Sequence, residues 1–330
     1  VSLQSSLGVA LVLLTGVGVA TSQISDVRTR SELLGVGVWT GVAMFIAAWL
    51  VNLIQQPLSL SHQLYWIWID ASLALGTGLV AGSFVQAALP VIENVFKVTT
   101  AMTLKELNDA SHPLLRRLAQ EAPGTYQHSL RLADIVEAAA AAIGANALLC
   151  KVGAMYHDVG KINKPLYFIE NQSDGINRHS KLSPAMSLLI IVGHVKDGLE
   201  MAREYHLPAP LRHFIESHHG TTLVEYFYHA ARKQSDAQNS PAPEEFEFRY
   251  PGPNPQTKEA AILMLGDTLE SAVRSLDEPS PSRIEQLVHT LANKRLTDGQ
   301  FHECNLTLQE LHKIEESMVK TLCAMFHGRI

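Results

Sequence analysis

An adjacent histidine and aspartate, His157 and Asp158, carry the clearest chemistry in this sequence. They end an apolar run, in residues 155–161 (MYHDVGK), and Gly160 follows as an expected helix stop. A carboxylate has two oxygens and can bridge two metal ions, whereas an imidazole offers one lone pair to one ion. Successive residues on a helix point about 100° apart. We therefore expect both side chains to point into a cleft that crosses the end of a helix.

Other residues of the same chemical types could complete a metal centre at this point. They are the remaining candidate ligands His128, His194, His218, His219 and Asp267. Two metal ions about 3.5–4 Å apart can hold a phosphodiester and activate a water molecule between them. The pattern therefore indicates a hydrolase with two metal ions that cuts a phosphodiester. The other histidines, except His179, are interpreted as surface or hydrogen-bonded side chains.

Helices are the elements that must position these residues. Apolar periodicity and capping residues predict helices over residues 126–143, 147–159, 183–205, 209–218, 221–232, 258–276, 281–296 and 307–326. Residues 233–257 are rich in proline, serine and glutamate and are predicted to form a long loop. No strand pattern follows residue 97. The predicted fold class is all-α, with transmembrane helices followed by a helical bundle.

The composition of the chain changes near residue 97. Residues 1–96 contain a short apolar stretch over 7–20 and longer ones over 33–54 and 64–92, the last with an expected membrane core at 71–92. Residues 97–330 hold most of the charges. A membrane span needs roughly 20 apolar residues. We therefore predict a membrane segment of about three helices over 1–96, a connector helix over 97–124 and a soluble catalytic domain over 125–330. A buried helical core of a soluble protein is the alternative for the first segment.

The basic residues near the expected spans predict an orientation. Arg28 and Arg30 lie in residues 21–32, residues 55–63 contain no lysine or arginine, and Lys97 and Lys105 follow the third span. Positive loops stay on the cytoplasmic side. The three cysteines lack metal-type spacing, which fits a reducing compartment. We expect a multi-pass protein of the cell (inner) membrane with a cytoplasmic catalytic domain, and the net charge of −6 argues against a nucleic acid polymer as partner.

In the order of its candidate ligands, the chain resembles the HD-domain metal phosphohydrolases. It resembles more closely the seven-transmembrane HD phosphodiesterases of the PgpH type, which hydrolyse cyclic di-AMP. The resemblance covers residues from about 90 to 330 and the apolar segments before them. The segments that carry it are EAPGTYQHS (121–129), GAMYHDVGKINKPLYFIENQ (153–172), SP (183–184), HVKDG (194–198), HHGTT (218–222) and RYPGPNPQTKEA (249–260).

The resemblance implies a set of ligands and a reaction. It places one divalent ion, typically iron or manganese, on His128, His157, Asp158 and Asp267. It places the second ion on His194, His218, His219 and the bridging Asp158. It implies that cyclic di-AMP is hydrolysed to linear pApA. The GYP element of related cyclic di-GMP enzymes is absent after residues 218–220, which makes cyclic di-GMP a weaker candidate.

The membrane part departs from the pattern of this family. About three spans are expected here instead of seven, and no large extracellular domain precedes them. We therefore interpret the chain as a fragment whose membrane part is truncated. Two other functions stay open, namely an HD-type nucleotidase or dNTP phosphohydrolase, and a metal-bound signalling module without turnover. A homo-oligomer also stays open.

The mechanism predicts further residues around the metal ions. Lys161 follows Asp158 by three residues and is expected to reach the same phosphate as a point charge. The predicted substrate contacts lie in two loops. They are Arg178, His179 and Lys181 for the second phosphate, and Arg249 and Tyr250 for a base.

Overall fold

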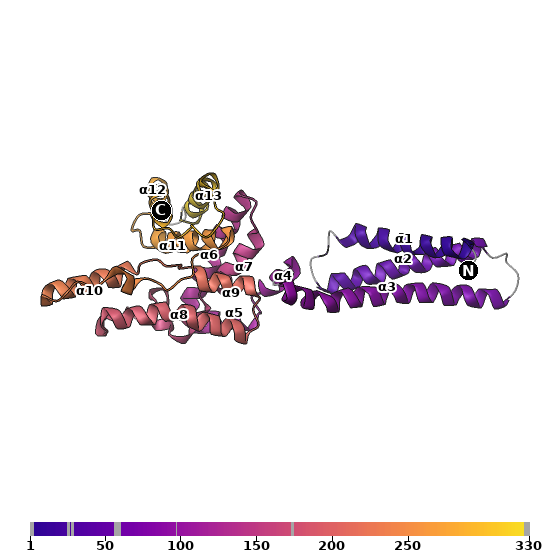
Figure 1. Ribbon diagram of the computed structural model, residues 1–330, viewed down its shortest axis with the longest axis horizontal. Helices are drawn as coiled ribbons and strands as arrows, with labels where there is room; N and C mark the ends of the chain where they lie inside the picture. The colour runs from indigo at the N-terminus through magenta and orange to yellow at the C-terminus, as the bar shows by residue number, and fades with distance from the viewer. Residues whose placement is uncertain are drawn as a thin grey trace. The chain divides into compact units, whose positions relative to one another are not determined.

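The computed structural model describes residues 3–24, 27, 30–55, 61–96, 98–172 and 175–326 of the 330-residue chain. The chain divides into two compact units, Val1–Glu106 and Leu107–Ile330, which are described separately below (Figure 1). Arg28 and Lys97, two of the residues that indicated the orientation, lie outside the described residues.

The first unit consists of three long apolar helices. They are α1 (Leu3–Ile24), α2 (Arg30–Gln55) and α3 (Ser61–Phe96), and each is long and apolar enough to cross a membrane. At most 22% of the residues in each candidate span are buried within the structure, so the apolar side chains face outwards, as lipid requires. The chain is a membrane protein, and its third candidate span, Tyr65–Glu93, matches the predicted apolar stretch 64–92 but begins before the expected core at Ala71.

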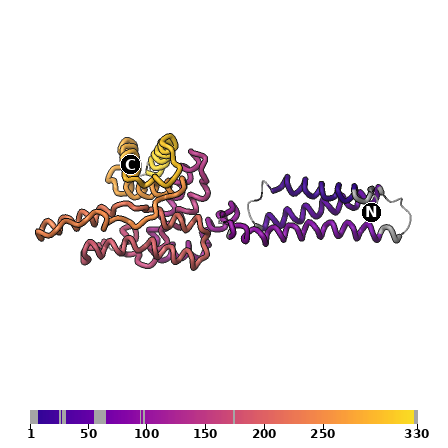
Figure 2. Tube along the Cα trace, in the orientation of Figure 1, coloured from indigo at the N-terminus to yellow at the C-terminus, as the bar shows by residue number. Residues whose placement is uncertain are grey.

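Glycines bring α2 and α3 into close contact, and Figure 2 shows their traces running side by side. A Cβ atom placed on Gly78 would lie only 2.4 Å from the Cα atom of Gly41. One on Gly82 would lie 2.8 Å from the Cα atom of Gly37. Small residues four apart let membrane helices approach to backbone contact, where packing stabilises them.

The predicted connector helix is two short helices, α4 (Ala101–Leu107) and α5 (Pro113–Glu121). A turn separates them, in which the Ser111 amide donates to Asp109 Oδ1 at 2.8 Å, and Pro113 then starts the new helix. Three leucines of α5 are fully buried in the second unit. The second half of the expected connector is therefore a packed element of this unit.

The second unit is all-α, as predicted. Its α-helices after α5 are α6 (Pro123–Ala142), α7 (Ala147–Tyr156), α8 (Pro184–Glu204), α9 (Ala209–Ser217), α10 (Glu225–Gln238), α11 (Lys258–Arg274), α12 (Pro281–Thr297) and α13 (Leu308–Phe326). Five short 3-10 helices join them: η1 (Val159–Asn163), η2 (Pro165–Tyr167), η3 (Ile169–Asn171), η4 (Arg178–Lys181) and η5 (Glu245–Phe248). Among the described residues there is no strand, only an isolated bridge between Leu223 and Arg249.

Several predicted element boundaries were wrong, and helix α6 begins at Pro123 instead of residue 126. Helix α7 ends at Tyr156 instead of residue 159, and Gly160 lies inside η1 instead of stopping the helix. Residues 221–224 do not begin α10, because backbone hydrogen bonds such as Val224 N to Phe248 O (2.9 Å) hold them extended. Helix α10 instead begins at Glu225 and runs into the predicted loop 233–257, which also contains η5.

Helices α6 and α11 lie at the centre of the second unit. Leu132, Ile135 and Val136 of α6 are fully buried, and eleven residues of α11 are buried, Asp267 among them. Fully burying a large apolar side chain stabilises the fold by about 1.5–3 kcal/mol. Polar side chains on these two helices are therefore held by a well-packed support.

Candidate metal centre

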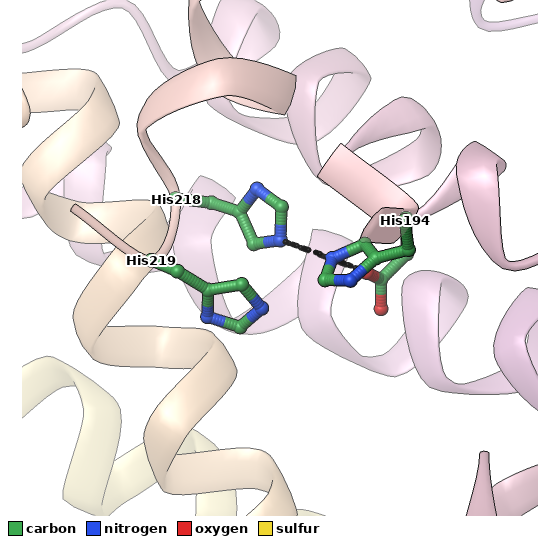
Figure 3. A group of neighbouring side chains, drawn as sticks. His194, His218 and His219 are labelled. Carbon is green, nitrogen blue, oxygen red and sulfur yellow. Dashed lines mark hydrogen bonds and ion pairs between the residues drawn. The ribbon is translucent and has the colours of Figure 1, made fainter. Parts of the chain in front are cut away.

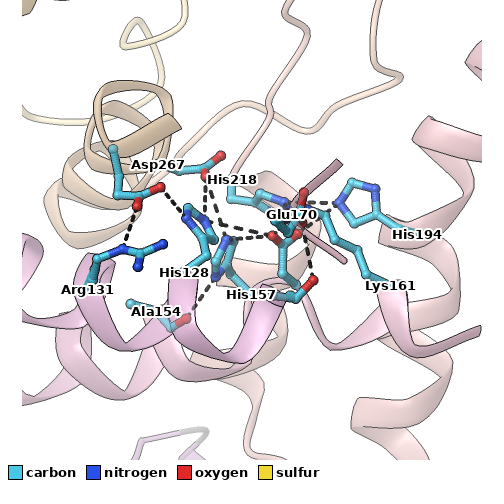
Figure 4. A network of polar contacts seen from close by, with 12 residues as sticks. His128, Arg131, Ala154, His157, Lys161, Glu170, His194, His218 and Asp267 are labelled. Carbon is cyan, nitrogen blue, oxygen red and sulfur yellow. Dashed lines mark hydrogen bonds and ion pairs between the residues drawn. The ribbon is translucent and has the colours of Figure 1, made fainter. Parts of the chain in front are cut away.

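Five segments place the seven predicted ligands around one point. His128 is on α6, His157 and Asp158 follow the end of α7, His194 is on α8, His218 and His219 follow α9, and Asp267 is on α11 (Figures 3 and 4). All seven are buried or nearly so. His219 has the most exposed side chain, at 22%, followed by Asp267 at 13%. The structure thus brings together residues that are up to 139 positions apart.

Asp158 lies between two groups of histidines. Its Oδ2 atom is 3.1 Å from His157 Nε2 and 4.0 Å from His128 Nε2. Its Oδ1 atom is 3.3 Å from His194 Nε2 and 3.6 Å from His218 Nε2. Each oxygen of this carboxylate therefore faces a different group, as a carboxylate that bridges two cations would require.

The ligand atoms of the two groups are close enough to share ions. One group is His128, His157 and Asp158, and the other is Asp158, His194, His218 and His219. Within each group, one ligand atom per residue lies within 4.8 Å of all the others. Figure 3 shows the rings of His194 and His218 facing each other, with 3.3 Å between their Nε2 atoms.

Asp267 closes the centre from the side of α11. Its Oδ1 atom is 3.0 Å from His128 Nε2 and 3.8 Å from His157 Nε2. Its Oδ2 atom is 3.9 Å from His219 Nδ1. The aspartate predicted near the middle of this helix thus faces the same pocket as the histidine–aspartate pair.

Backbone carbonyl groups orient three of the histidines. The Nδ1 atoms of His157, His194 and His218 lie at 2.8, 2.5 and 2.9 Å from the carbonyl oxygens three residues earlier. A hydrogen bond to a carbonyl oxygen places the proton on Nδ1. The Nε2 atom of each ring then presents its lone pair to the pocket, as a metal ligand must.

Electrostatics within the pocket favour a cation. Burial alone would lower the pKa of His157, but Asp158 and Asp267 outweigh it and raise this pKa to about 10. The two carboxylates thus favour positive charge at His157 Nε2, where a divalent ion would take the place of a proton. Burial would raise the pKa of Asp158, yet His157 and Lys161 hold it well below its ordinary value. Burial lowers the pKa of His218 and of His219, so both imidazoles stay neutral.

Two atoms of the pocket lack a hydrogen-bonding partner among the described residues. His157 Nε2 and Asp158 Oδ1 are both buried, and the imidazole and carboxylate atoms 3.1–3.3 Å from them are not aligned for a hydrogen bond. Buried polar atoms without a partner are uncommon, because a polar group that loses its hydrogen bonds to water and gains none in the protein costs about 1–3 kcal/mol. The imidazole and carboxylate donors fit divalent metal ions, which would satisfy both atoms.

Lys161 is held between two carboxylates at the edge of the pocket. Its Nζ atom lies 2.7 Å from Asp158 Oδ2 and 2.8 Å from Glu170 Oε1, and it sits over the Phe168 ring. Figure 4 shows Lys161 and Glu170 in the same network of polar contacts. Burial opposes the charge, but the two carboxylates outweigh it and hold the pKa of Lys161 above its ordinary value. The ammonium group therefore stays charged and holds Asp158 in place.

Gly160 allows α8 to approach the histidine–aspartate turn. A Cβ atom on Gly160 would lie 1.9 Å from the carbonyl oxygen of His194 and 2.4 Å from the amide nitrogen of Gly198. Any side chain here would push α8 away. This glycine therefore sets the distance between His194 and Asp158.

The predicted substrate contacts lie in different surroundings. Tyr250 stacks on His219, with ring centroids 4.2 Å apart, so it lines the centre. Arg249 instead donates hydrogen bonds to Asp298, Glu245 and the Thr221 carbonyl oxygen.

The other three predicted contacts are residues of η4. His179 lies 2.9 Å from the carbonyl oxygen of Tyr167 through its Nε2 atom, and its ring contacts Phe227. Arg178 donates to the Ile176 carbonyl oxygen at 3.3 Å, and Lys181 is exposed. Only Tyr250, of the five predicted contacts, has a described contact with a ligand residue.

Three supporting residues were not predicted from the sequence. Glu170 accepts hydrogen bonds from Lys161 and Thr125. Glu270 Oε2 lies 2.6 Å from His128 Nδ1, and Glu270 Oε1 accepts from Arg131 at 2.7 Å. Arg131 and Glu270 each lie three residues after a candidate ligand on the same helix face. That spacing is the one sequence signal that could have indicated Arg131 and Glu270.

Family comparisons agree with the two-unit organisation. Residues 125–272 match the HD domain model, and residues 1–100 match the model described as 7TM receptor with intracellular HD hydrolase. Two curated relatives are named cyclic-di-AMP phosphodiesterase PgpH. The protein of Bacillus subtilis (strain 168) is 42% identical over 305 residues, 92% of this chain and 42% of the relative. That of Listeria monocytogenes serotype 1/2a (strain 10403S) is 38% identical over 327 residues, 98% of this chain and 44% of the relative.

Solved structures resemble the second unit. A crystal structure of the L. monocytogenes PgpH HD domain has a TM-score of 0.62 and 45% identity, and covers 66% of this chain and all of that chain. The same domain in complex with cyclic di-AMP has a TM-score of 0.63 and 44% identity, and covers 66% of this chain and 99% of that chain. The chain spans less than half the length of the two curated relatives.

Proposed function

Because this chain belongs to the family of membrane proteins that carry an HD hydrolase domain, we propose that it is a metal-dependent phosphodiesterase that hydrolyses cyclic di-AMP. One observation carries the proposal: a single carboxylate, Asp158, faces two separate groups of histidines with its two oxygens. This arrangement fits two divalent ions on one shared ligand, which is the donor set needed for hydrolysis of a phosphodiester.

We assign one ion to His128, His157, Asp158 and Asp267. The second ion belongs to His194, His218, His219 and the shared Asp158. Imidazole with carboxylate donors suits iron and manganese, which we propose as the native metals. When bound, the two ions lower the pKa of a water molecule and offset negative charge on the phosphate oxygens.

The protein side chains hold this centre and expose one side of it. Lys161 and Glu170 fix Asp158, because the ammonium group lies within 2.8 Å of both carboxylates. Lys161 is also proposed to stabilise the phosphate as a point charge. His219 and Asp267 are the most exposed ligands, so the substrate approaches from their side, where Tyr250 stacks on His219.

The relatives' names support cyclic di-AMP as the substrate. In the proposed reaction, a water oxygen bonds to one phosphorus atom while one ester bond to a ribose oxygen breaks. The ribose oxygen gains a proton, and the product is linear pApA. Arg178, His179, Lys181 and Arg249 remain proposed substrate contacts, although all but the exposed Lys181 are engaged elsewhere in this structure.

The proposed placement of the chain has the membrane segment at residues 1–96, the connector at 97–124 and the catalytic domain at 125–330. The catalytic domain lies on the cytoplasmic side, as the basic residues beside the spans indicate.

The test is hydrolysis by the full chain purified in detergent and loaded with manganese or iron. Cyclic di-AMP should yield pApA, detected by anion-exchange chromatography, whereas the Asp158→Asn variant should lose most metal and nearly all turnover while its helix content stays unchanged. Near-normal turnover by this variant would show that the shared carboxylate has no role.

A nucleotide panel separates the proposal from its competitors. Cyclic di-GMP, a dNTP and a nucleoside monophosphate should be hydrolysed at least tenfold more slowly than cyclic di-AMP. Preference for the dNTP or the monophosphate would indicate a nucleotidase or dNTP phosphohydrolase. Metal binding without turnover of any of the four would indicate a signalling module.

A further inference from the structure

The five histidines of the centre are not oriented in the same way. His157, His194 and His218 direct Nδ1 to a backbone carbonyl oxygen three residues earlier. His128 instead directs Nδ1 to a carboxylate, with 2.6 Å to Glu270 Oε2. A carboxylate partner makes an imidazole a stronger electron donor to a metal than a neutral carbonyl does. His128 is therefore the most basic ligand of the four.

Glu270 is itself held as a carboxylate. It is fully buried, its Oε1 atom accepts from Arg131 Nε at 2.7 Å, and Arg274 lies 3.7 Å from Oε2. A buried carboxylate needs such compensation, because an uncompensated charge is strongly destabilising. The arginines thus keep Glu270 charged and fix its orientation towards His128.

Two helices supply both a ligand and its support at the same spacing. His128 and Arg131 are three residues apart on α6, and Asp267 and Glu270 are three residues apart on α11. Residues at this spacing lie on one face of a helix. Figure 4 shows Arg131 and His128 side by side on α6, with Asp267 opposite His128. One pair of helix faces therefore builds this side of the centre.

We infer that the two metal positions are unequal, and that Glu270, with Arg131, positions His128 so that the ion on its side binds first and more tightly. The inference rests on the proposed metal centre. The His128 side has two carboxylates, Asp158 and Asp267, and an imidazole supported by a third. The other side has three imidazoles, of which two are oriented by carbonyls, and only the shared Asp158. The Lys161 ammonium group lies 2.7 Å from Asp158 Oδ2 on the His128 side, but Glu170, 2.8 Å away, offsets its charge. Asp267 therefore leaves more negative charge around the first position, which binds a divalent cation more strongly.

The Glu270→Gln variant tests this assignment with little change in volume. The single oxygen of glutamine can accept a hydrogen bond from His128 or from Arg131. Its NH₂ group only donates, so it cannot accept a hydrogen bond from the other partner. The variant therefore removes the charge and one of two acceptors. Losing such a support typically costs 10–100-fold in metal affinity.

The experiment is a manganese titration of the full chain in detergent after chelator treatment. Free Mn²⁺ is followed by electron paramagnetic resonance, and helix content is checked by circular dichroism. The unmodified chain should bind two ions in two steps. Glu270→Gln should weaken the tighter step about 10–100-fold and leave the weaker step within about threefold. Glu204→Gln, an exposed change at the end of α8, should alter neither step.

His194→Ala provides a second measurement that does not depend on Glu270 or on how well its variant folds. It removes a ligand of the second position only, so it should abolish the weaker step and keep the tighter one. The inference is overturned if Glu270→Gln leaves the tighter step unchanged, if it weakens both steps equally, or if His194→Ala removes the tighter step. No nucleotide is present, so a chain that binds two ions in this order yet leaves cyclic di-AMP intact would refute the proposed function alone.

Discussion

Replacing Gly160 by alanine should disrupt the centre without changing any ligand. The added Cβ atom would lie 1.9 Å from the His194 carbonyl oxygen, roughly 1.6 Å short of an ordinary contact of about 3.5 Å. The backbone of η1 and that of α8 must separate by a large part of this distance. Because His194 Nε2 lies only 3.3 Å from Asp158 Oδ1, the two ligands would no longer reach the same ion.

The expected loss can be estimated from this displacement. A misplacement of about 1 Å in a catalytic site costs roughly 10²-fold in rate. Overpacking of a buried site costs about 1–3 kcal/mol of stability. We therefore expect kcat/KM for cyclic di-AMP to fall by at least about 10²-fold, with a lower melting temperature and loss of the second metal ion.

A neighbouring glycine offers a matched control. Gly193, directly before His194 on the same helix, has nothing within 4 Å of an added Cβ atom. Gly193→Ala should keep full activity and stabilise the helix by up to about 1 kcal/mol. Turnover is measured as pApA formation, metal content by elemental analysis and stability by thermal unfolding. If Gly160→Ala retained both metal ions and turned over within twofold of the unmodified chain, the close approach of α8 would not set the geometry of the centre.

Three further perturbations test other parts of the chain. Lys161→Met should lower turnover about 10²-fold and weaken metal binding, because a buried carboxylate loses its cation; normal metal content with normal turnover would contradict this. Burial would raise the pKa of Asp298, but hydrogen bonds from Arg249 lower this pKa below the ordinary 3.8. The pair therefore stabilises the fold at neutral pH, and this stabilisation is lost as the pH falls through that acid range. Arg249→Gln should therefore lower the melting temperature at pH 7, with the difference narrowing below about pH 4; a difference that persists in acid would refute the ion-pair explanation. Gly78→Leu should separate α2 from α3 and lower the thermal stability of the membrane unit, whereas Gly76→Leu, with open space around an added Cβ, should not.

The sequence alone determined the class of the fold and indicated the candidate ligands that the structure brings together. An uncharged apolar run of about 20 residues predicts a membrane span, so helices α2 and α3 follow from composition. The run 7–20 was shorter, and the structure extends its helix to Leu3–Ile24. The helices of the second unit follow from apolar periodicity and from caps such as Ser183 before Pro184, where the serine accepts from the Met186 amide. The candidate ligands could be predicted because histidines and aspartates in this order resemble a known family.

Only the tertiary structure decided how those ligands are supported. Glu270 and Arg131 look like ordinary surface residues in the sequence, and Glu270 meets His128 across 142 positions of chain. Gly160 was predicted to stop a helix, yet it gives α8 room beside the turn that carries His157 and Asp158. Local patterns describe which face of a helix is apolar. Which charged residue is buried beside which ligand depends on how distant helices pack, and packing brings together groups whose separation along the chain carries no local signal.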